Sequence, residues 1–490
     1  MLRAAAWAII LVVVAASEAR TQTEELLARQ AKLEDQIAAL QQKLMAKEAA
    51  EEQGERQLSP GAVASKDDVT SLKTCLDYMW LLICGALVMF MQAGFSVLEA
   101  GSCRAKTAGM ILTKNVMDAC VGTLVWYIWG YAFAYGAPEN NVNEFMGHKH
   151  FAGSYMMTTE GSEKAITGTN HFKDWFFQWA FCATAATIVS GGVAERIRFE
   201  AYVVYSIVMT GIIYPIVVWW TWSGNGWLSI KGYSDFAGSG IVHLTGGIGA
   251  LVGAIIIKPR TGRFNPKDDD APDRFDPHNL AFVVIGTFIL WFGWYGFNCG
   301  STLAFSDVGT ATQAALVAMN TTISAATGGI TLFILRLFRR QGKYDLAGMC
   351  NGILVGLVSV CAGVGDVMPW GALILGLLGA ICHEIASITL EKLQVDDPLD
   401  AFAVHGAGGM IGLVMRPILD RTGAKGEMLG WNIVGLLVIS AWSGVLSAAV
   451  FGIFRLFGKL RISEEEEEKG SDMMAQQLYR TTTMQKEVST

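Results

Sequence analysis

The stretch Asp235-Phe-Ala-Gly-Ser-Gly-Ile-Val-His243-Leu-Thr-Gly-Gly247 decides the fold. It opens an apolar run, yet it places an aspartate at the start of that run and a histidine two helical turns further in. A second stretch, Asp400-Ala-Phe-Ala-Val-His405-Gly-Ala-Gly-Gly409, repeats the pattern Val-His-x-x-Gly-Gly. An ionisable group inside a membrane span is costly and by default functional. Two such histidines in matching contexts predict a repeated fold with its working site at the interface between the repeats.

The composition indicates a membrane protein. The chain has 490 residues, of which 52% are hydrophobic and 17% are charged, whereas soluble domains carry about 25% charged residues. Apolar runs of about 20 residues, enough to cross a bilayer, recur from 75 to 458. Nine cysteines, an odd number scattered mostly in or beside these runs, argue against a disulfide framework. The net charge of −7 comes partly from the acidic run 464–468 and identifies no partner.

We therefore expect an all-α polytopic membrane protein with about eleven transmembrane helices. They would form two inverted five-helix repeats plus a final helix, within a transmembrane domain over 74–458. The expected spans are 75–101, 109–136, 174–194, 200–222, 235–257, 277–300, 309–335, 346–365, 370–390, 400–419 and 430–458.

The distribution of Lys and Arg predicts the orientation, because basic residues favour cytoplasmic loops. With the amino terminus outside, the cytoplasmic loops hold most of the basic loop residues, and the short outer loops 301–308 and 366–369 hold none. The carboxyl terminus is then cytoplasmic. The basic cytoplasmic groups are Arg104 and Lys106, Arg196 and Arg198, those within 258–274, those within 336–343, Lys392, and those within 455–461.

The amino-terminal region precedes the spans. Residues 1–19 indicate a cleaved signal peptide, with an uncleaved signal anchor as the alternative. Within the extracellular region 20–73, Leu26, Leu33 and Leu40 recur every seven residues, which predicts a short coiled coil over 21–57. About three heptads are marginal alone, so a solvated single helix or a linker is the alternative. Residues 58–73 are typical of a linker, and 459–490 form a cytoplasmic tail.

The paired histidines are the strongest candidates for a working site. A neutral imidazole has one donor and one acceptor nitrogen, so two neutral rings could share a hydrogen bond and still serve a passing solute. No Cys, Asp or Glu lies at a ligand spacing beside them, which argues against a metal. The sequence contains neither a phosphate-binding loop nor a nucleophile with a matching base. It therefore gives no indication of an enzyme, a cofactor or a nucleic acid partner. Gly246-Gly247 and Gly408-Gly409 would leave room for a narrow path.

Aromatic and acidic residues cluster at the outer ends of several spans. Phe177 and Phe181 are four apart, on one helix face, and an aromatic cluster at an outer mouth can recognise a small cation. Asp235 can cap its helix and also supply a fixed negative charge. We expect Asp396, Asp397 and Asp400 to cap the next helix, and His148, His150 and His171 to be ordinary surface residues.

The chain resembles the ammonium transporter family (Amt/Mep/Rh) over about 75–480, and most closely its plant and algal Amt branch. The motifs that carry the resemblance are Asp235-Phe-Ala-Gly-Ser, Val-His243, Ala194-Glu-Arg-Ile-Arg-Phe199, Gly293-Trp-Tyr-Gly-Phe-Asn-Cys-Gly-Ser301, and Val395-Asp-Asp-Pro398 through His405-Gly406. Details that favour the Amt branch are Ala100-Gly-Ser-Cys-Arg-Ala-Lys106 and Asn115-Val-Met-Asp118.

The resemblance implies a role for each matching residue. His243 and His405 would be the paired pore histidines, and Asp235 would support the outer cation site. Two stacked rings, Phe181 and Phe297, would gate the pore. The outer recruitment site would be formed by Phe177, Trp222 and Ser301. The resemblance also implies a homotrimer with one pore per subunit and a regulatory tail, from which this chain departs at Gln476-Gln477.

The expected function is therefore ammonium transport across a lipid bilayer, with the plasma membrane as the expected location. Ammonium would be captured outside and deprotonated at the ring pair, and ammonia would pass the histidines, with or without its proton. An ammonium sensor that signals through the tail, with a regulatory protein bound there, is the main alternative. Passage of a neutral gas such as carbon dioxide is a third.

Overall fold

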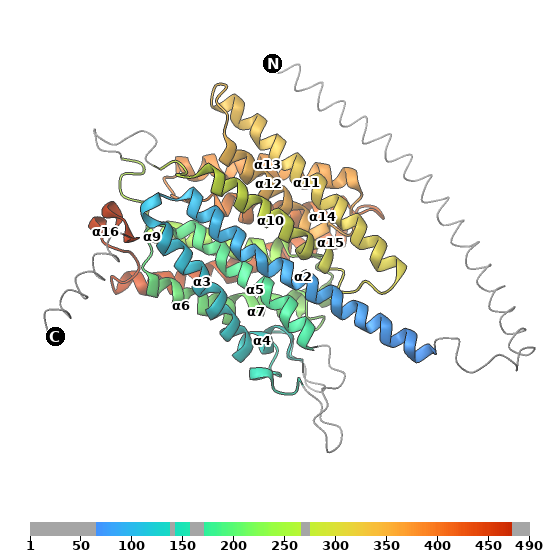
Figure 1. Cartoon of the computed structure of the whole chain (residues 1–490). Helices are drawn as coiled ribbons and strands as arrows, with labels where there is room; N and C mark the ends of the chain where they lie inside the picture. The colour runs from blue at the N-terminus through green and yellow to red at the C-terminus, as the bar shows by residue number, and fades with distance from the viewer. Residues whose placement is uncertain (1–64, 138–142, 157–170, 266–274, 473–490) are drawn as a thin grey trace, which may run out of the picture. The chain divides into compact units, whose positions relative to one another are not determined.

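A computed structural model gives the structure and describes residues 65–137, 143–156, 171–265 and 275–472 (Figure 1). The expected signal peptide and heptad segment, and the distal tail with Gln476 and Gln477, lie outside the described residues. The chain divides into two units, 1–74 and 75–490, and the description below concerns the larger one.

The described part of this unit is helical and contains no β-sheet. Ten helical segments there are long and apolar enough to cross a membrane, and the shorter segment Phe402–Ile418 is an eleventh candidate, in agreement with the predicted fold class. The segments are α2 (Lys66–Ser102), α3 with η2 and α4 (Ala108–Tyr135), α5 (His171–Val193), α6 with η4 and α7 (Phe199–Thr221), η5 (Ser239–Leu244) with α9 (Thr245–Ile257), α10 (Leu280–Gly300), α11 (Val308–Arg339), α12 (Leu346–Val360) with η6 (Cys361–Gly363), α13 (Pro369–Lys392), η7 (Phe402–Ala407) with α14 (Gly408–Ile418), and α15 (Gly426–Leu456).

The two histidine-bearing spans begin later than predicted. Helical structure starts at Ser239 and at about Phe402, not at 235 and 400. Gly238 has φ of 105° and Asp400 has φ of 52°, both in the left-handed region. A right-handed helix cannot continue through such a conformation, so both aspartates lie in the irregular segments that precede the helices.

The histidine-bearing segments meet reciprocally. η5 contacts η7, α9 packs against η7, and α14 packs against η5. η5 and η7 are both π-helical, and each of them thus contacts the α-helix that follows the other. This exchange is what two inverted copies of one broken helix predict.

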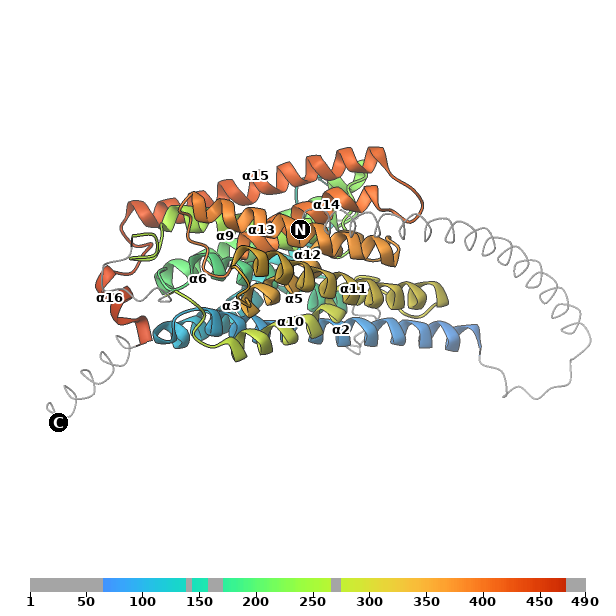
Figure 2. The ribbon, with the colours of Figure 1, turned by 90° about the horizontal axis from the view of Figure 1, so that it is seen from above.

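Burial distinguishes the centre of the bundle from its periphery. In the most apolar stretch of α5, 89% of the residues are buried, whereas in that of α15 only 22% are buried. Figure 2 shows α15 along one side of the bundle and α2 and α10 along the opposite side. On α15, Leu437, Val445 and Ile453 are more than half exposed. Such a face suits lipid, where apolar exposure carries no hydrophobic penalty.

Candidate functional site

The two histidine rings meet at the crossing of the broken helices. The Nδ1 atoms of His243 and His405 are 3.1 Å apart, and the ring centroids are 5.2 Å apart with the planes inclined by 20°. His243 is fully buried and His405 is 5% exposed. Since two Nδ1 atoms face each other, one must donate and the other must accept.

Glycine permits this close crossing. A Cβ atom on Gly247 would lie 2.3 Å from the backbone nitrogen of Gly406, the residue after His405. A Cβ atom on Gly409 would lie 2.3 Å from the backbone oxygen of Ser239. The backbones therefore touch on both sides of the histidine pair, and a larger side chain at either position would push them apart.

A column of aromatic rings leads to the histidines. Phe181 of α5 stacks on Phe297 of α10 with centroids 4.1 Å apart. The ring of Phe297 lies 5.4 Å from that of His243, and Trp294 stacks on the same imidazole at 5.2 Å. The phenylalanine pair has no exposed surface, so it closes the approach to His243.

Asp235 is tied to the backbone around it. Its Oδ1 accepts from the N–H groups of Gly238 and Ser239, each at 2.9 Å, and its Oδ2 accepts from those of Gly240 and Ile241 at 2.8 and 3.1 Å. These are the free donors at the start of η5, so the carboxylate caps that turn, as the sequence predicted. It also leaves a fixed negative group near the aromatic column.

An outer cavity of about 320 Å³ lies at the end of α5 that carries Asp174. Trp222 and Ser301, two of the three residues assigned to an outer recruitment site, line it. Phe177 is not one of its lining residues: it is buried against Phe181, with centroids 4.8 Å apart. The remaining lining residues are Tyr131, Tyr135, His171, Asp174, Gln178, Phe236 and Leu303, none of which the sequence analysis had singled out for the cavity.

The interpretation of the outer histidines as ordinary surface residues is wrong for two of the three. His150 is 4% exposed, His171 is half-buried, and their ring centroids are 4.3 Å apart. Burial lowers the pKa of His150 below its ordinary value. His148 is exposed, as predicted. The loop packs onto Tyr131 and its neighbours, a contact between distant segments that the local sequence does not reveal.

At the opposite end of α5, which we call the tail face, charged residues form a buried network. Arg260 lies 2.5 Å from Glu195 and 2.8 Å from Asp396. Burial raises the pKa of Asp396, but Arg260 and Arg196 outweigh it and hold the pKa well below its usual range. The expectation that all three aspartates of this segment cap the next helix holds only for Asp397, which accepts from Phe402 N–H at 2.8 Å. Asp396 and Asp400 instead form ion pairs with arginines.

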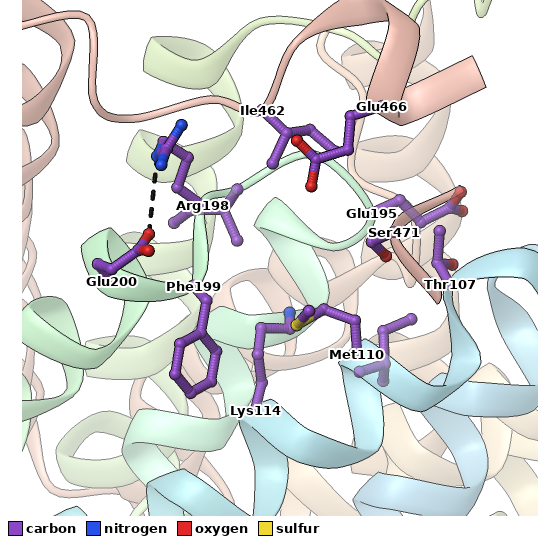
Figure 3. A pocket seen from close by; sticks show the side chains of 12 residues that line it. Thr107, Met110, Lys114, Glu195, Arg198, Phe199, Glu200, Ile462, Glu466 and Ser471 are labelled. Carbon is purple, nitrogen blue, oxygen red and sulfur yellow. Dashed lines mark ion pairs between the residues drawn. The ribbon is translucent and has the colours of Figure 1, made fainter. Parts of the chain in front are cut away.

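The proximal tail folds back onto this face. Asp472 accepts from the N–H groups of Gly109 and Met110 at the start of α3, at 2.7 and 2.8 Å. Glu467, which has no exposed surface, accepts from Thr261 N–H at 2.7 Å and pairs with Arg461 at 2.6 Å. Figure 3 shows the resulting pocket. Ile462 and Glu466 of the tail lie across it from Met110, Lys114 and Phe199.

The structure thus brings together the eight residues singled out for the pore and its mouth, although Phe177 packs against Phe181 instead of lining the cavity. It also reveals a third buried histidine, His383, with no exposed surface. Its position within an otherwise apolar run of α13 is a sequence signal that marks it as a candidate. Among the described residues, no group of three or more His, Cys, Asp or Glu side chains could hold a metal ion.

A helical bundle whose two broken helices meet at a buried histidine pair defines a multi-pass membrane transport protein. The sequence profile of the Ammonium Transporter Family matches residues 79–479. The chain is 39% identical over 424 residues to "Ammonium transporter Amt2" of Archaeoglobus fulgidus, covering 81% of this chain and 86% of that one. It is 37% identical to "Ammonium transporter 1 member 3" of Solanum lycopersicum, covering 85% and 95%.

Solved structures agree with this assignment. A structure described as "Sensor Amt Protein" has a TM-score of 0.74 at 31% identity, covering 82% of this chain and 98% of that one. Candida albicans Mep2 has a TM-score of 0.70 at 29% identity, covering 81% and 89%. The chain therefore belongs to the Ammonium Transporter Family, whose members are transporters and not enzymes.

Proposed function

We propose that this chain captures ammonium at the outer cavity, removes its proton near Phe181 and Phe297, and conducts ammonia past His243 and His405. One observation carries the proposal: the imidazoles share a 3.1 Å contact at the buried crossing of the repeats, directly below a stacked aromatic pair. The column offers apolar faces and neutral ring nitrogens, which suit an uncharged base.

Magnitudes favour ammonia over the ion inside the column. An isolated ammonium ion in an apolar medium costs tens of kcal/mol on an idealised estimate. If ammonium binds its proton about as tightly as a lysine side chain does, about three pKa units above neutrality, deprotonation costs about 4 kcal/mol. Loss of the proton is therefore the cheaper route. Trp222 and Ser301 would hold the ion before that step, aided by the charge of Asp235 and the aromatic faces.

The proposal includes the setting of the pore. The tail face is cytoplasmic and the outer cavity extracellular, since the basic loops gather at the tail face. The chain works as a homotrimer in the plasma membrane, with one pore in each subunit.

The test is uptake of labelled ammonium by the purified full-length protein in liposomes. His243→Ala and His405→Ala each remove one ring of the pair, so uptake should fall at least tenfold. His148→Ala is the matched control, because it removes an exposed histidine outside the column. Wild-type rates in both pore variants would refute the assigned role.

A second function, ammonium sensing, is favoured by the similarity to the protein described as "Sensor Amt Protein" and by the docked proximal tail. Complementation separates the two functions. In a yeast strain that cannot import ammonium, a transporter restores growth on low ammonium, whereas a pure sensor does not.

A further inference from the structure

His383 is an intramembrane histidine that the proposed pore does not use. It lies on α13, has no exposed surface, and neither ring nitrogen has a hydrogen-bond partner among the described residues. Buried polar groups are nearly always hydrogen-bonded, and an orphaned one calls for an explanation. A histidine in an otherwise apolar run is also costly in a membrane and by default functional.

The nearest ionisable partner of His383 is Asp400. The Nε2 atom of His383 is 3.6 Å from Oδ2 of Asp400, beyond hydrogen-bond length but within reach of a small ring rotation. Asp400 also accepts from Arg336 at 3.1 Å, Asn351 at 3.2 Å and Ser387 at 2.9 Å. Burial raises the pKa of Asp400, but His383 and Arg336 outweigh it and keep the pKa below its usual value.

The other charged groups of this region are already paired. Arg336 contacts Asp345 and Glu384 at 3.0 Å each, and Arg339 contacts Glu384 at 2.9 Å. Because both arginines are held by carboxylates, the positive field at His383 is partly cancelled. A transient imidazolium therefore has a compensating anion, Asp400, within 4 Å.

The pair lies between the pore and the tail face. His405 is on η7, and η7 packs against α13. Asp400 immediately precedes η7 and lines two cavities on the tail face, of about 180 and 440 Å³. His383 thus lies on a helix that packs against the segment of His405, and it faces a carboxylate that borders two cavities.

We propose that His383 and Asp400 form a proton exit path that continues the histidine pair to the tail face. The proposal rests on the proposed function, because deprotonation of ammonium supplies the proton. His405 holds His243 through Nδ1, so its Nε2 is free to pass a proton on. The His405 Nε2–H bond breaks, and the proton reaches Nδ1 of His383 through a bridging water, because Nδ1 of His383 has no direct hydrogen-bond partner among the described residues. The His383 Nε2–H bond then breaks as an O–H bond forms at Oδ2 of Asp400, which releases the proton into the cavities.

Histidine suits this position because its two nitrogens can receive a proton on one side and release it on the other. Glutamine at 383 would keep a polar side chain there but cannot carry a proton, and leucine would restore the apolar run. A purely structural His383 would change stability when replaced, without changing the charge moved per ammonium.

The test measures labelled ammonium uptake and ammonium-elicited current together, on the full-length protein in liposomes. In His383→Gln and His383→Leu we expect uptake to stay within about twofold of wild type, and the current per ammonium to fall at least tenfold. Ser387→Ala is the matched control, because it removes a hydrogen bond to Asp400 without removing a titratable group. Its current per ammonium should equal that of wild type.

Two results would overturn the exit path while leaving the proposed function intact: wild-type uptake without current, or an unchanged current per ammonium in a folded His383 variant. Absence of any wild-type uptake would instead refute the proposed function. If neither variant folds, the wild-type current decides. Measured in heavy water, a proton-carried current falls at least twofold relative to uptake, and a current without this isotope effect overturns the path.

Discussion

At the scale of single residues, the polar groups of this bundle divide by how fully they are paired. Asp235 has both carboxylate oxygens occupied by backbone N–H groups, and Asp396 has both occupied by Arg260. Within the described parts of the chain, neither ring nitrogen of His383 has a hydrogen-bond partner, and only one carboxylate oxygen of Asp397 has one. Fully paired groups hold the fold, whereas an unpaired buried group such as His383 calls for an explanation.

Replacing Asp235 by Asn should destabilise the protein as well as stop transport. Whichever oxygen becomes an amide nitrogen, it would face two backbone N–H donors that it cannot accept from. Each unpaired donor costs about 1–3 kcal/mol. We expect a lower melting temperature in detergent and an uptake reduced at least tenfold.

Asp174→Asn is the control for this experiment, because it removes a carboxylate charge at the outer cavity without touching the η5 cap. It should melt like the wild type. An Asp235→Asn protein with wild-type melting would show that the cap contributes little.

Asp397 should set a pH dependence of stability. Burial raises its pKa to about 7, and Asp400 adds to the shift. This pKa is above the value in the unfolded chain, about 3.9, so the group stabilises the folded state at low pH and that stability is lost as pH rises from about 4 to about 7. Asp397→Asn removes the charge and should melt higher than wild type above pH 7.

The melting difference between Asp397→Asn and wild type should shrink towards about pH 4. Asp396→Asn is the contrasting variant. Its carboxylate has a lowered pKa and is paired with Arg260, so the variant should melt below the wild type at neutral pH. A gain for Asp397→Asn that is the same at every pH would contradict the linkage.

At the scale of elements, the working geometry depends on how closely the two broken helices cross. Gly247→Ala places a Cβ atom 2.3 Å from the backbone nitrogen of Gly406, so α9 and η7 must separate. The 3.1 Å contact between the histidines should be lost with it. We expect uptake to fall at least tenfold and stability to fall by about 1–3 kcal/mol, as for other overpacked sites.

The control is Gly444→Ala on α15, where the nearest atom to a new Cβ is at an ordinary 3.5 Å. It should transport like the wild type. If Gly247→Ala also transports normally, the close crossing is not what aligns the rings.

The helices themselves could be predicted from the sequence, because a bilayer demands apolar runs of fixed length. The starts of the two broken helices at Ser239 and Phe402 could not, because a left-handed residue interrupts the apolar run without changing its composition. The histidine pair could be found from a repeated motif, and Asp235 from its position at the start of the apolar run that carries His243. His383 has no counterpart in that motif, and the burial of His150 depends on how a long loop packs against distant helices.

At the scale of the whole molecule, the proximal tail links parts of the tail face that are distant in sequence. Asp472 caps α3, and Glu467 binds the segment after α9. A Cβ atom on Gly470 between them would lie 2.6 Å from Lys106, so only glycine fits this approach. Movement of the tail would therefore be transmitted to the starts and ends of several helices, which is the arrangement that a sensor or a regulated transporter needs.

The proposed trimer gives the heptads of 21–57 a purpose. About three heptads are too short to form a stable coiled coil alone, but in the proposed trimer three copies would be concentrated enough to associate. Deleting 21–57 should therefore lower the temperature at which the trimer dissociates on native gels, while uptake per subunit stays the same, because the residues assigned to the pore and the outer cavity lie outside this segment. Replacing Leu26, Leu33 and Leu40 by Ser should reproduce the deletion. An equally heat-resistant trimer in both variants would mean that the segment clamps nothing.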